Sequence, residues 1–185
     1  MEMASWVILF GNKRSSDGQL SSPVGITVYS DRVFVADNSN NRISVFQCDG
    51  QFSNTFGSGH LSRPYDVAVT NNNQVLVADC GHHCISIFTL DGNYVNKIGT
   101  QGSDRGQLNH PFGLAIDLYG FILVTEGGNS RVSIFDKDGV FIHCFGSSGS
   151  SVGQFSYPRG IACSPNGSVY VCDQYNKRIQ IFSDY

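Results

Sequence analysis

Four stretches of the chain repeat one pattern, in which an apolar run ends in an acid, a short polar turn follows, and a second apolar run closes the unit. They read VFVADNSNNRISVF (33–46), VLVADCGHHCISIF (75–88), ILVTEGGNSRVSIF (122–135) and VYVCDQYNKRIQIF (169–182). Runs of four to six residues rich in Val, Ile and Phe, bounded by Asn, Asp and Gly, are typical of β-strands between tight turns. Each stretch therefore predicts a β-hairpin.

A further apolar run precedes each hairpin, and another follows each of the first three. The run before each one opens with a proline, at positions 23, 64, 111 and 158. The first three hairpins are followed by Asp-Gly pairs at 49–50, 91–92 and 138–139, which favour a type I′ turn because its central residues need positive φ. Four strands in each repeat of about 45 residues are what a β-propeller blade requires.

We therefore expect an all-β chain that forms one propeller domain over residues 1–185, with blades at about 12–57, 58–99, 100–146 and 147–185. The segment 6–10 (WVILF) has the pattern of a fourth strand, and the fourth repeat stops after its third strand. The N-terminal strand is thus expected to complete the last blade and cover its open edge. The repeats leave three arrangements open: a closed four-bladed ring, an open arc, or part of a larger propeller. Self-association is possible if four blades do not close.

Composition narrows the class of protein. The 185 residues carry a net charge of −3, so a general, charge-driven affinity for nucleic acid is not expected. No run approaches the ~18 apolar residues of a membrane span, and no basic segment marks WVILF as a signal peptide. The six cysteines show no framework spacing, which predicts reduced thiols and a cytoplasmic location.

Three of the hairpin turns contain an acid, an asparagine three residues later and an arginine five residues later. Because a residue type repeated in nearly every blade usually serves the blade itself, we interpret the charged pairs as structural, with a ligand-reading role as the alternative. The pairs are Asp37 with Arg42, Glu126 with Arg131, and Asp173 with Arg178.

The second hairpin departs from this pattern in DCGHHC (79–84). Cys80, His82, His83 and Cys84 are side chains that zinc prefers. One short turn would be strained to place four ligands tetrahedrally, however, and no second such cluster exists, so we predict no metal site and no cofactor. Cys84 stands in the arginine position, which leaves Asp79 without its usual partner. A nearby histidine is one candidate for that role.

In a propeller, the turns inside these hairpins and the loops between blades lie on one face. Sorted in this way, that face receives nine bases and seven acids, whereas the opposite face receives two bases and eight acids. Aromatic side chains beside arginines on the first face favour binding of a peptide or of nucleobases, although Tyr65 and Phe112 would alternatively cap the core near the axis. The candidate binding residues are Arg63, Tyr65, His82, His83, His110, Phe112, Tyr157, Arg159, Tyr175 and Lys177.

These phrases, with Gly-Gln-Leu or Gly-Gln-Phe at 18–20, 106–108 and 153–155, resemble NHL repeats over essentially the whole chain. NHL propellers usually have six blades, so four is a departure. The resemblance to the C-terminal propellers of tripartite-motif (TRIM-NHL) ubiquitin ligases implies a non-enzymatic module that binds a protein or peptide, as a scaffold or in substrate recognition. Ligase activity itself would need a RING domain, and the chain has no paired Cys-x-x-Cys for one.

Two other functions remain open. Some NHL propellers bind RNA through the same face, and here that face is only weakly basic. An enzyme similar to the peptide-amidating lyase would need histidines contributed by several blades. The five histidines of this chain do not recur in register.

Overall fold

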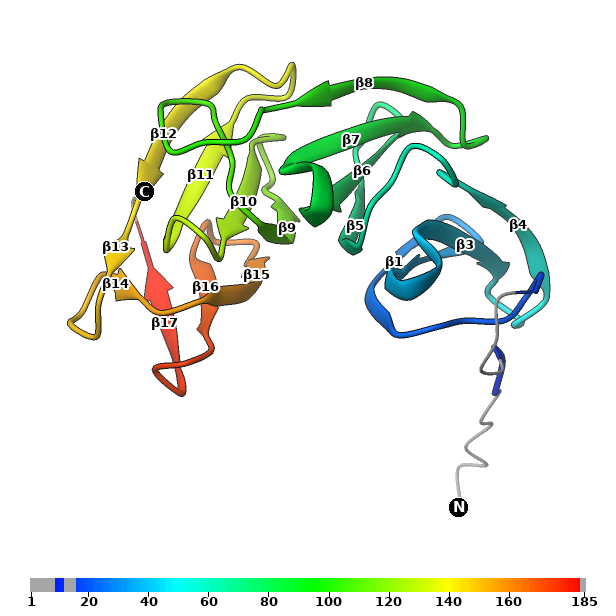
Figure 1. The fold of residues 1–185 in the computed structure, drawn as a ribbon, viewed down its shortest axis with the longest axis horizontal. Helices are drawn as coiled ribbons and strands as arrows, with labels where there is room; N and C mark the ends of the chain where they lie inside the picture. Colours follow the sequence, from blue (N-terminus) through cyan, green and yellow to red (C-terminus); the bar gives the residue numbers. More distant parts are fainter. Residues whose placement is uncertain (1–8, 12–15, 184–185) are drawn as a thin grey trace.

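A computed structural model describes residues 9–11 and 16–183 of the chain. The four repeats form four antiparallel β-sheets that follow one another around an arc (Figure 1). The predicted all-β propeller of four blades is confirmed. Nowhere in the described ranges is there a helix with the length and hydropathy needed to cross a bilayer.

Each of the first three blades has four strands in chain order, and the described part of the fourth blade has three. The blades are β1 (Pro23–Tyr29), β2 (Arg32–Asp37), β3 (Arg42–Gln47) and β4 (Phe52–Phe56); β5 (Pro64–Val69), β6 (Gln74–Asp79), β7 (Cys84–Thr89) and β8 (Tyr94–Ile98); β9 (Pro111–Ile116), β10 (Ile122–Glu126), β11 (Arg131–Phe135) and β12 (Phe141–Phe145); and β15 (Pro158–Cys163), β16 (Val169–Asp173) and β17 (Arg178–Phe182). Two short strands, β13 (Ser147–Ser148) and β14 (Gln154–Phe155), pair in the loop before the last blade.

The central hairpin of each blade ends in the same way. The acid that closes the second strand is paired in register with the residue that opens the third, as Asp37 is with Arg42 and Asp79 is with Cys84. In the first two blades a 3₁₀ turn joins these strands, over Asn38–Asn40 and Cys80–His82. The last turn residue takes a left-handed backbone, with φ of 51° at Asn41 and 55° at His83. The residue types found in these turns thus follow from a backbone conformation that the blades share.

The core consists of the faces that neighbouring blades press together. Phe34 and Val45 of blade one pack with Val77 and Phe88 of blade two. Equivalent clusters join blades two and three and blades three and four. Because blades two and three have both faces covered, their central strands are apolar on both sides rather than alternating.

The two end faces of the arc are not covered in this way, and the arc is open between β15 and β1 (Figure 1). Ile26 of β1 is 61% exposed, whereas Val67 at the same position of blade two is 2% exposed. At the other end, Ile181 is 62% exposed, whereas its counterpart Val45 is fully buried. Side chains of core type therefore face outward at both ends.

The predicted closing strand at 6–10 falls mostly outside the described residues; of its described part, Phe10 packs against Phe46 of blade one, with ring centroids 4.8 Å apart. Alignment with Ala36 and Ala78 also predicts that Cys172 lies in the core. That expectation is wrong, because Cys172 belongs to the uncovered end face and is exposed.

We predict that the 185-residue chain associates with itself through these end faces. Replacing both Ile26 and Ile181 by Lys should lower the average mass measured by light scattering at high concentration, because exposed apolar area that drives association is replaced by charge. The unfolding temperature should stay within a few degrees. Replacing the exposed Ser53 and Ser103 by Lys adds the same charge elsewhere and should leave the mass unchanged. A mass unaffected by the isoleucine substitutions would contradict the prediction.

Candidate functional site

The hairpin turns and the loops between blades lie on one face and are bonded to each other. The Ser39 amide donates to the Ser21 carbonyl oxygen, and the Gly81 amide donates to that of Ser62. Blades three and four repeat this contact, for example from the Tyr175 amide to the Ser156 carbonyl. We call this surface the loop face. Because each loop is held to a turn, the side chains that it presents have fixed positions.

A buried carboxylate lies beneath each turn. In three blades it pairs with the arginine that opens the third strand. The Nε–carboxylate distances are 3.0 Å for Arg42–Asp37, 2.7 Å for Arg131–Glu126 and 2.7 Å for Arg178–Asp173. All three acids are inaccessible to solvent. Burial alone would raise the pKa of Asp173, but hydrogen bonds from the Ser156 amide, Asn176 and Arg178 outweigh it and lower that pKa. The pairs thus act inside the protein and present no acid to a ligand.

Blade two keeps the acid without the arginine. Asp79 accepts from the Ser62 amide at 2.9 Å and from the Ser86 hydroxyl at 3.0 Å. Its remaining partner is His82, whose Nδ1 lies 3.0 Å from Asp79 Oδ2. A histidine therefore does lie beside the acid, as DCGHHC suggested. His82 stands where Asn40 stands in blade one, so it replaces the asparagine rather than the arginine.

The four candidate zinc ligands of this turn are divided among different environments. His82 faces Asp79, whereas the His83 ring packs on His110 with centroids 4.4 Å apart. Burial raises the pKa of both the Cys80 and Cys84 thiols to about 11, which disfavours the thiolate that zinc requires. Within the described part of the chain, no group of three or more His, Cys, Asp or Glu side chains could hold a metal ion.

The inner strand of each blade begins near the propeller axis. In blade four this end of the strand carries Arg159, which is surrounded by aromatic rings. The Arg159 guanidinium carbon lies 5.4 Å from the Tyr65 ring centroid, 5.0 Å from that of Phe112 and 5.5 Å from that of Tyr157. Tyr157 in turn stacks on Tyr175 at 4.9 Å, with the rings 7° from parallel. We call these five residues the axial cluster. It joins candidates from three blades, and Phe112 is its buried base.

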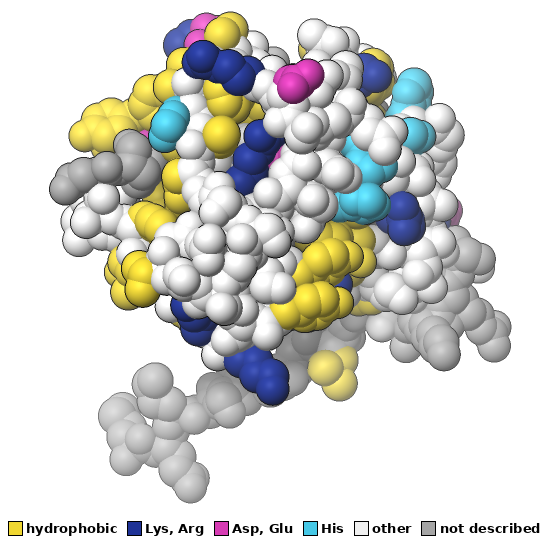
Figure 2. Space-filling view, turned by 60° about the vertical axis from the view of Figure 1, so that its left-hand side comes forward, with side chains coloured by type: hydrophobic (Ala, Val, Ile, Leu, Met, Phe, Trp, Pro, Cys, Tyr) yellow, Lys and Arg dark blue, Asp and Glu magenta, His cyan; other side chains and the backbone are white. Residues whose placement is uncertain are grey.

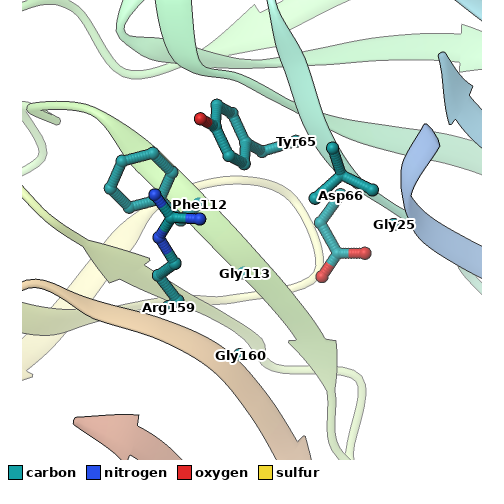
Figure 3. A pocket seen from close by; sticks show the side chains of 8 residues that line it. Gly25, Tyr65, Asp66, Phe112, Gly113, Arg159 and Gly160 are labelled. Carbon is teal, nitrogen blue, oxygen red and sulfur yellow. The ribbon is translucent and has the colours of Figure 1, made fainter. Parts of the chain in front are cut away.

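The axial cluster borders a cavity of about 150 Å³ that also touches Asp66 and the glycines at 25, 113 and 160 (Figure 3). Arg159 rises between Phe112 and Tyr65, whereas the Asp66 carboxylate points toward the glycines. Cation–π contacts hold the guanidinium over the rings but satisfy none of its N–H groups. Among the described residues, Arg159 Nε is buried without a hydrogen-bond partner. This arrangement suits a ligand that brings an acceptor.

Asp66 is the residue of this cavity that the sequence analysis did not single out. It stands where the other three blades have Gly25, Gly113 and Gly160, a difference that could have identified it. Its two oxygens accept from the Val67 and Leu114 amides at 2.9 Å each, which ties blade two to blade three. Burial raises the pKa of Asp66 to about 6. Gly25 and Gly113 are needed, because a Cβ would collide with Asp66 at the first position and with the Arg159 carbonyl oxygen at the second.

The other candidate residues, Arg63, His82, His83, His110 and Lys177, lie outside the axial cluster. The His110 amide donates to His83 Nδ1 at 3.1 Å, which fixes these two rings as a pair. Burial and the neighbouring His110 lower the pKa of His83, which favours the neutral form of its ring. Arg63 and Lys177 are exposed and have left-handed backbones. Figure 2 shows histidine side chains gathered beside basic and apolar side chains on one part of the surface.

Comparison with known proteins agrees with the repeat pattern. A family profile described as the NHL repeat matches residues 20–46, 61–88 and 155–182, which fall in blades one, two and four. The chain carries NHL repeats. The third blade lies outside the matched segments, and its acid is Glu126 where the matched blades have Asp.

Protein lin-41 from Caenorhabditis elegans is 49% identical to this chain over 47 residues, a quarter of this chain and 4% of that protein. The propeller thus resembles those of TRIM-NHL proteins. Streptogramin B lyase has a similar fold, with a TM-score of 0.72 and 20% identity over 95% of this chain and 55% of its own. The WD40 propeller of Doa1 gives 0.71 and 16% over 89% of this chain and 52% of its own. This chain thus spans about half of either propeller, and these two likenesses show the fold alone.

Removing one buried ion pair should be costly. We expect Arg42→Cys, which copies the composition of blade two, to lower the free energy of unfolding by about 3 kcal/mol, because it leaves Asp37 buried without its cation. Urea denaturation measures the change. Lys137→Cys breaks a pair that is exposed on both sides and should have no measurable effect. Equal effects of the two substitutions would show that the buried pair has no special role.

The Asp66 carboxyl should make stability depend on pH. Its pKa is raised from 3.8 to about 6 by folding, so the folded state binds its proton more tightly than the unfolded state. That stabilisation is complete below pH 3.8 and is lost as pH rises through 6. Relative to Asp66→Asn, the wild type should gain about 2.5 kcal/mol of unfolding free energy between pH 7 and pH 4. A difference that does not change with pH would refute the assignment.

Proposed function

We propose that this propeller is a non-enzymatic interaction module that binds an extended segment of a partner protein across the loop face, with the axial cluster at the centre of the contact. The observation that carries the proposal is the environment of Arg159. A guanidinium packed on three rings, with a buried N–H left without an acceptor, has the composition of an interface hot spot. A carboxylate or backbone carbonyl from the partner would complete it.

The surroundings support a peptide more than a small-molecule substrate. The cavity beside Arg159 holds only about 150 Å³, less than the ~300 Å³ lower bound of ordinary ligand sites. Its titratable side chain, Asp66, is turned away from the arginine and is committed to two backbone amides. No nucleophile–base pair stands beside it within the described residues, so we propose no catalytic role. The likeness to a lyase at 20% identity does not bear on activity.

RNA is the second candidate because of one specific feature. Tyr157 and Tyr175 form a parallel pair beside Arg159, a platform on which a base could stack. Both readings use the same residues. They differ in salt dependence, since RNA contacts release counterions and peptide contacts through one arginine do so weakly. A cytoplasmic location and a place in a TRIM-type ubiquitin ligase are further proposals that follow from the resemblance.

Selection from a phage-displayed library of random dodecapeptides tests the proposal. We expect enriched peptides that contain Asp, Glu or a free carboxyl terminus and that bind Arg159→Ala at least about tenfold more weakly, since one charged hydrogen bond contributes on the order of 1.5–3 kcal/mol. Arg159→Lys keeps the charge and checks that the loss is not unfolding. Lys137→Ala, on the opposite face, is the matched control.

Two results would overturn the peptide proposal. One is enrichment of peptides that bind Arg159→Ala and the wild type equally. The other is enrichment from a random RNA pool, with affinity that falls steeply with salt and no peptide selected. The second result would establish the RNA alternative instead.

A further inference from the structure

The arginine position of blade two is the most informative irregularity of the fold. In the other blades the guanidinium joins the buried acid to the preceding inter-blade loop. The Nη2 group of each arginine donates a hydrogen bond to a glutamine carbonyl in that loop. The distances are 2.8 Å for Arg42–Gln19, 2.9 Å for Arg131–Gln107 and 2.7 Å for Arg178–Gln154. Three blades therefore show one recurring guanidinium site, with an acid on one side and a loop carbonyl on the other.

Blade two retains the rest of that site. Asp79 is fully buried and accepts hydrogen bonds from the Ser62 amide and the Ser86 hydroxyl. Asp37 accepts the same pair of bonds from Ser21 and Ser44. His60, four residues before Pro64, holds the position of the three glutamines whose carbonyls accept from the arginines. The arginine is replaced by Cys84. The Cys84 side chain ends at a thiol 3.8 Å from the Ser86 hydroxyl, and burial raises its pKa to about 11, so it carries no charge.

A cavity of about 340 Å³ occupies the place of the missing side chain. Its lining residues are His60, Asp79, His82, Cys84, Ser86, Tyr94 and Lys97. His60 and Tyr94 stack with centroids 4.9 Å apart and 8° between the rings, and so form an aromatic wall. The composition thus offers a buried carboxylate at the bottom and aromatic faces at the side, which is the environment that a guanidinium prefers.

Two basic side chains of the chain itself, His82 and Lys97, face this cavity, and neither replaces the arginine. His82 bonds to Asp79 from the rim with half of its side chain exposed, in the place of the asparagine of the other blades. Lys97 lies on β8 opposite Ser86 and is exposed. Among the described residues, no ion pair joins it to Asp79. An ammonium prefers hydration to burial and lacks the planar fork that reaches an acid and a carbonyl together.

We propose that the blade-two cavity is a recognition site for a guanidinium group, filled by an arginine side chain of a partner protein that supplies the contact made internally in the other blades. The partner's Nε and Nη groups would donate to Asp79 and to the loop that contains His60, and the side chain would enter past Tyr94. The site is separate from the axial cluster, so it stands or falls independently of the function proposed above.

Capped tripeptides test this site directly. Acetyl-Ala-Arg-Ala-amide should produce saturable shifts of the backbone amide resonances near Ser62, His82 and Ser86 at millimolar concentration. Acetyl-Ala-Lys-Ala-amide should bind at least about fivefold more weakly, because a single ammonium cannot make the paired contacts. Methylguanidinium should shift the same resonances, which separates the guanidinium group from the peptide as the source of binding.

Three variants make the result decisive. Cys84→Arg places an internal guanidinium in the cavity, so it should abolish the shifts and raise the urea midpoint of unfolding. Asp79→Asn keeps the volume and should weaken binding at least about tenfold, since it removes the charge that the guanidinium meets. Lys97→Ala should bind as tightly as the wild type or more tightly, because a competing cation is gone.

The proposal fails if no saturable shift appears, if Cys84→Arg binds the tripeptide as the wild type does, or if the lysine and arginine peptides bind equally. It also fails if Lys97→Ala lowers the urea midpoint as much as Arg42→Cys does, since Lys97 would then be the internal replacement. If Cys84→Arg does not fold, Asp79→Asn and Lys97→Ala still decide the question.

Discussion

The buried acid at the end of each second strand is the constraint on which the rest of this propeller depends. A carboxylate without access to solvent must be satisfied on every side, because an uncompensated charge inside a protein is very costly. Here the partners come from three places: the turn asparagine or histidine, the third strand, and the loop that leads in from the previous blade. One side chain thus holds the turn to the third strand and to the incoming loop, which fixes the loop face.

Every blade follows that constraint, and the differences between blades show where the surface becomes specific. In blades one, three and four the acid forms an ion pair with an arginine of the same blade. In blade two the acid contacts His82 but has no arginine partner. Blade two also has Asp66 where the other blades have an axial glycine. The deviations of blade two and the Arg159 cluster of blade four lie on the same face, where the loops are held rigidly. Variation is therefore concentrated where a partner could use it, while the acids remain internal.

Much of the fold and of the turn contacts could be predicted from the sequence, because each repeat can be aligned with the other three. The strands, the blades, the acid–arginine pairs and the histidine beside Asp79 all follow from register. The cavity beside Cys84 could not be predicted, since its volume depends on how Tyr94 and His60 pack. The exposed end faces were also missed: Ile181 and Cys172 have the letters of core residues, and only the three-dimensional arc shows that no blade covers them. Asp66 was one of the seven acids that the charge count assigned to the loop face, because residue type alone does not show whether a side chain is buried.

The central claim is that the acid of each blade is a built guanidinium site, and that blade two retains this site without its cation. A double-mutant cycle of Cys84→Arg with Asp79→Asn, read by urea denaturation, tests it most directly. We expect the introduced arginine to stabilise the protein only when Asp79 is present, with a coupling free energy of about 1.5–3 kcal/mol. A coupling of zero, with the arginine equally favourable or unfavourable in both backgrounds, would contradict the account.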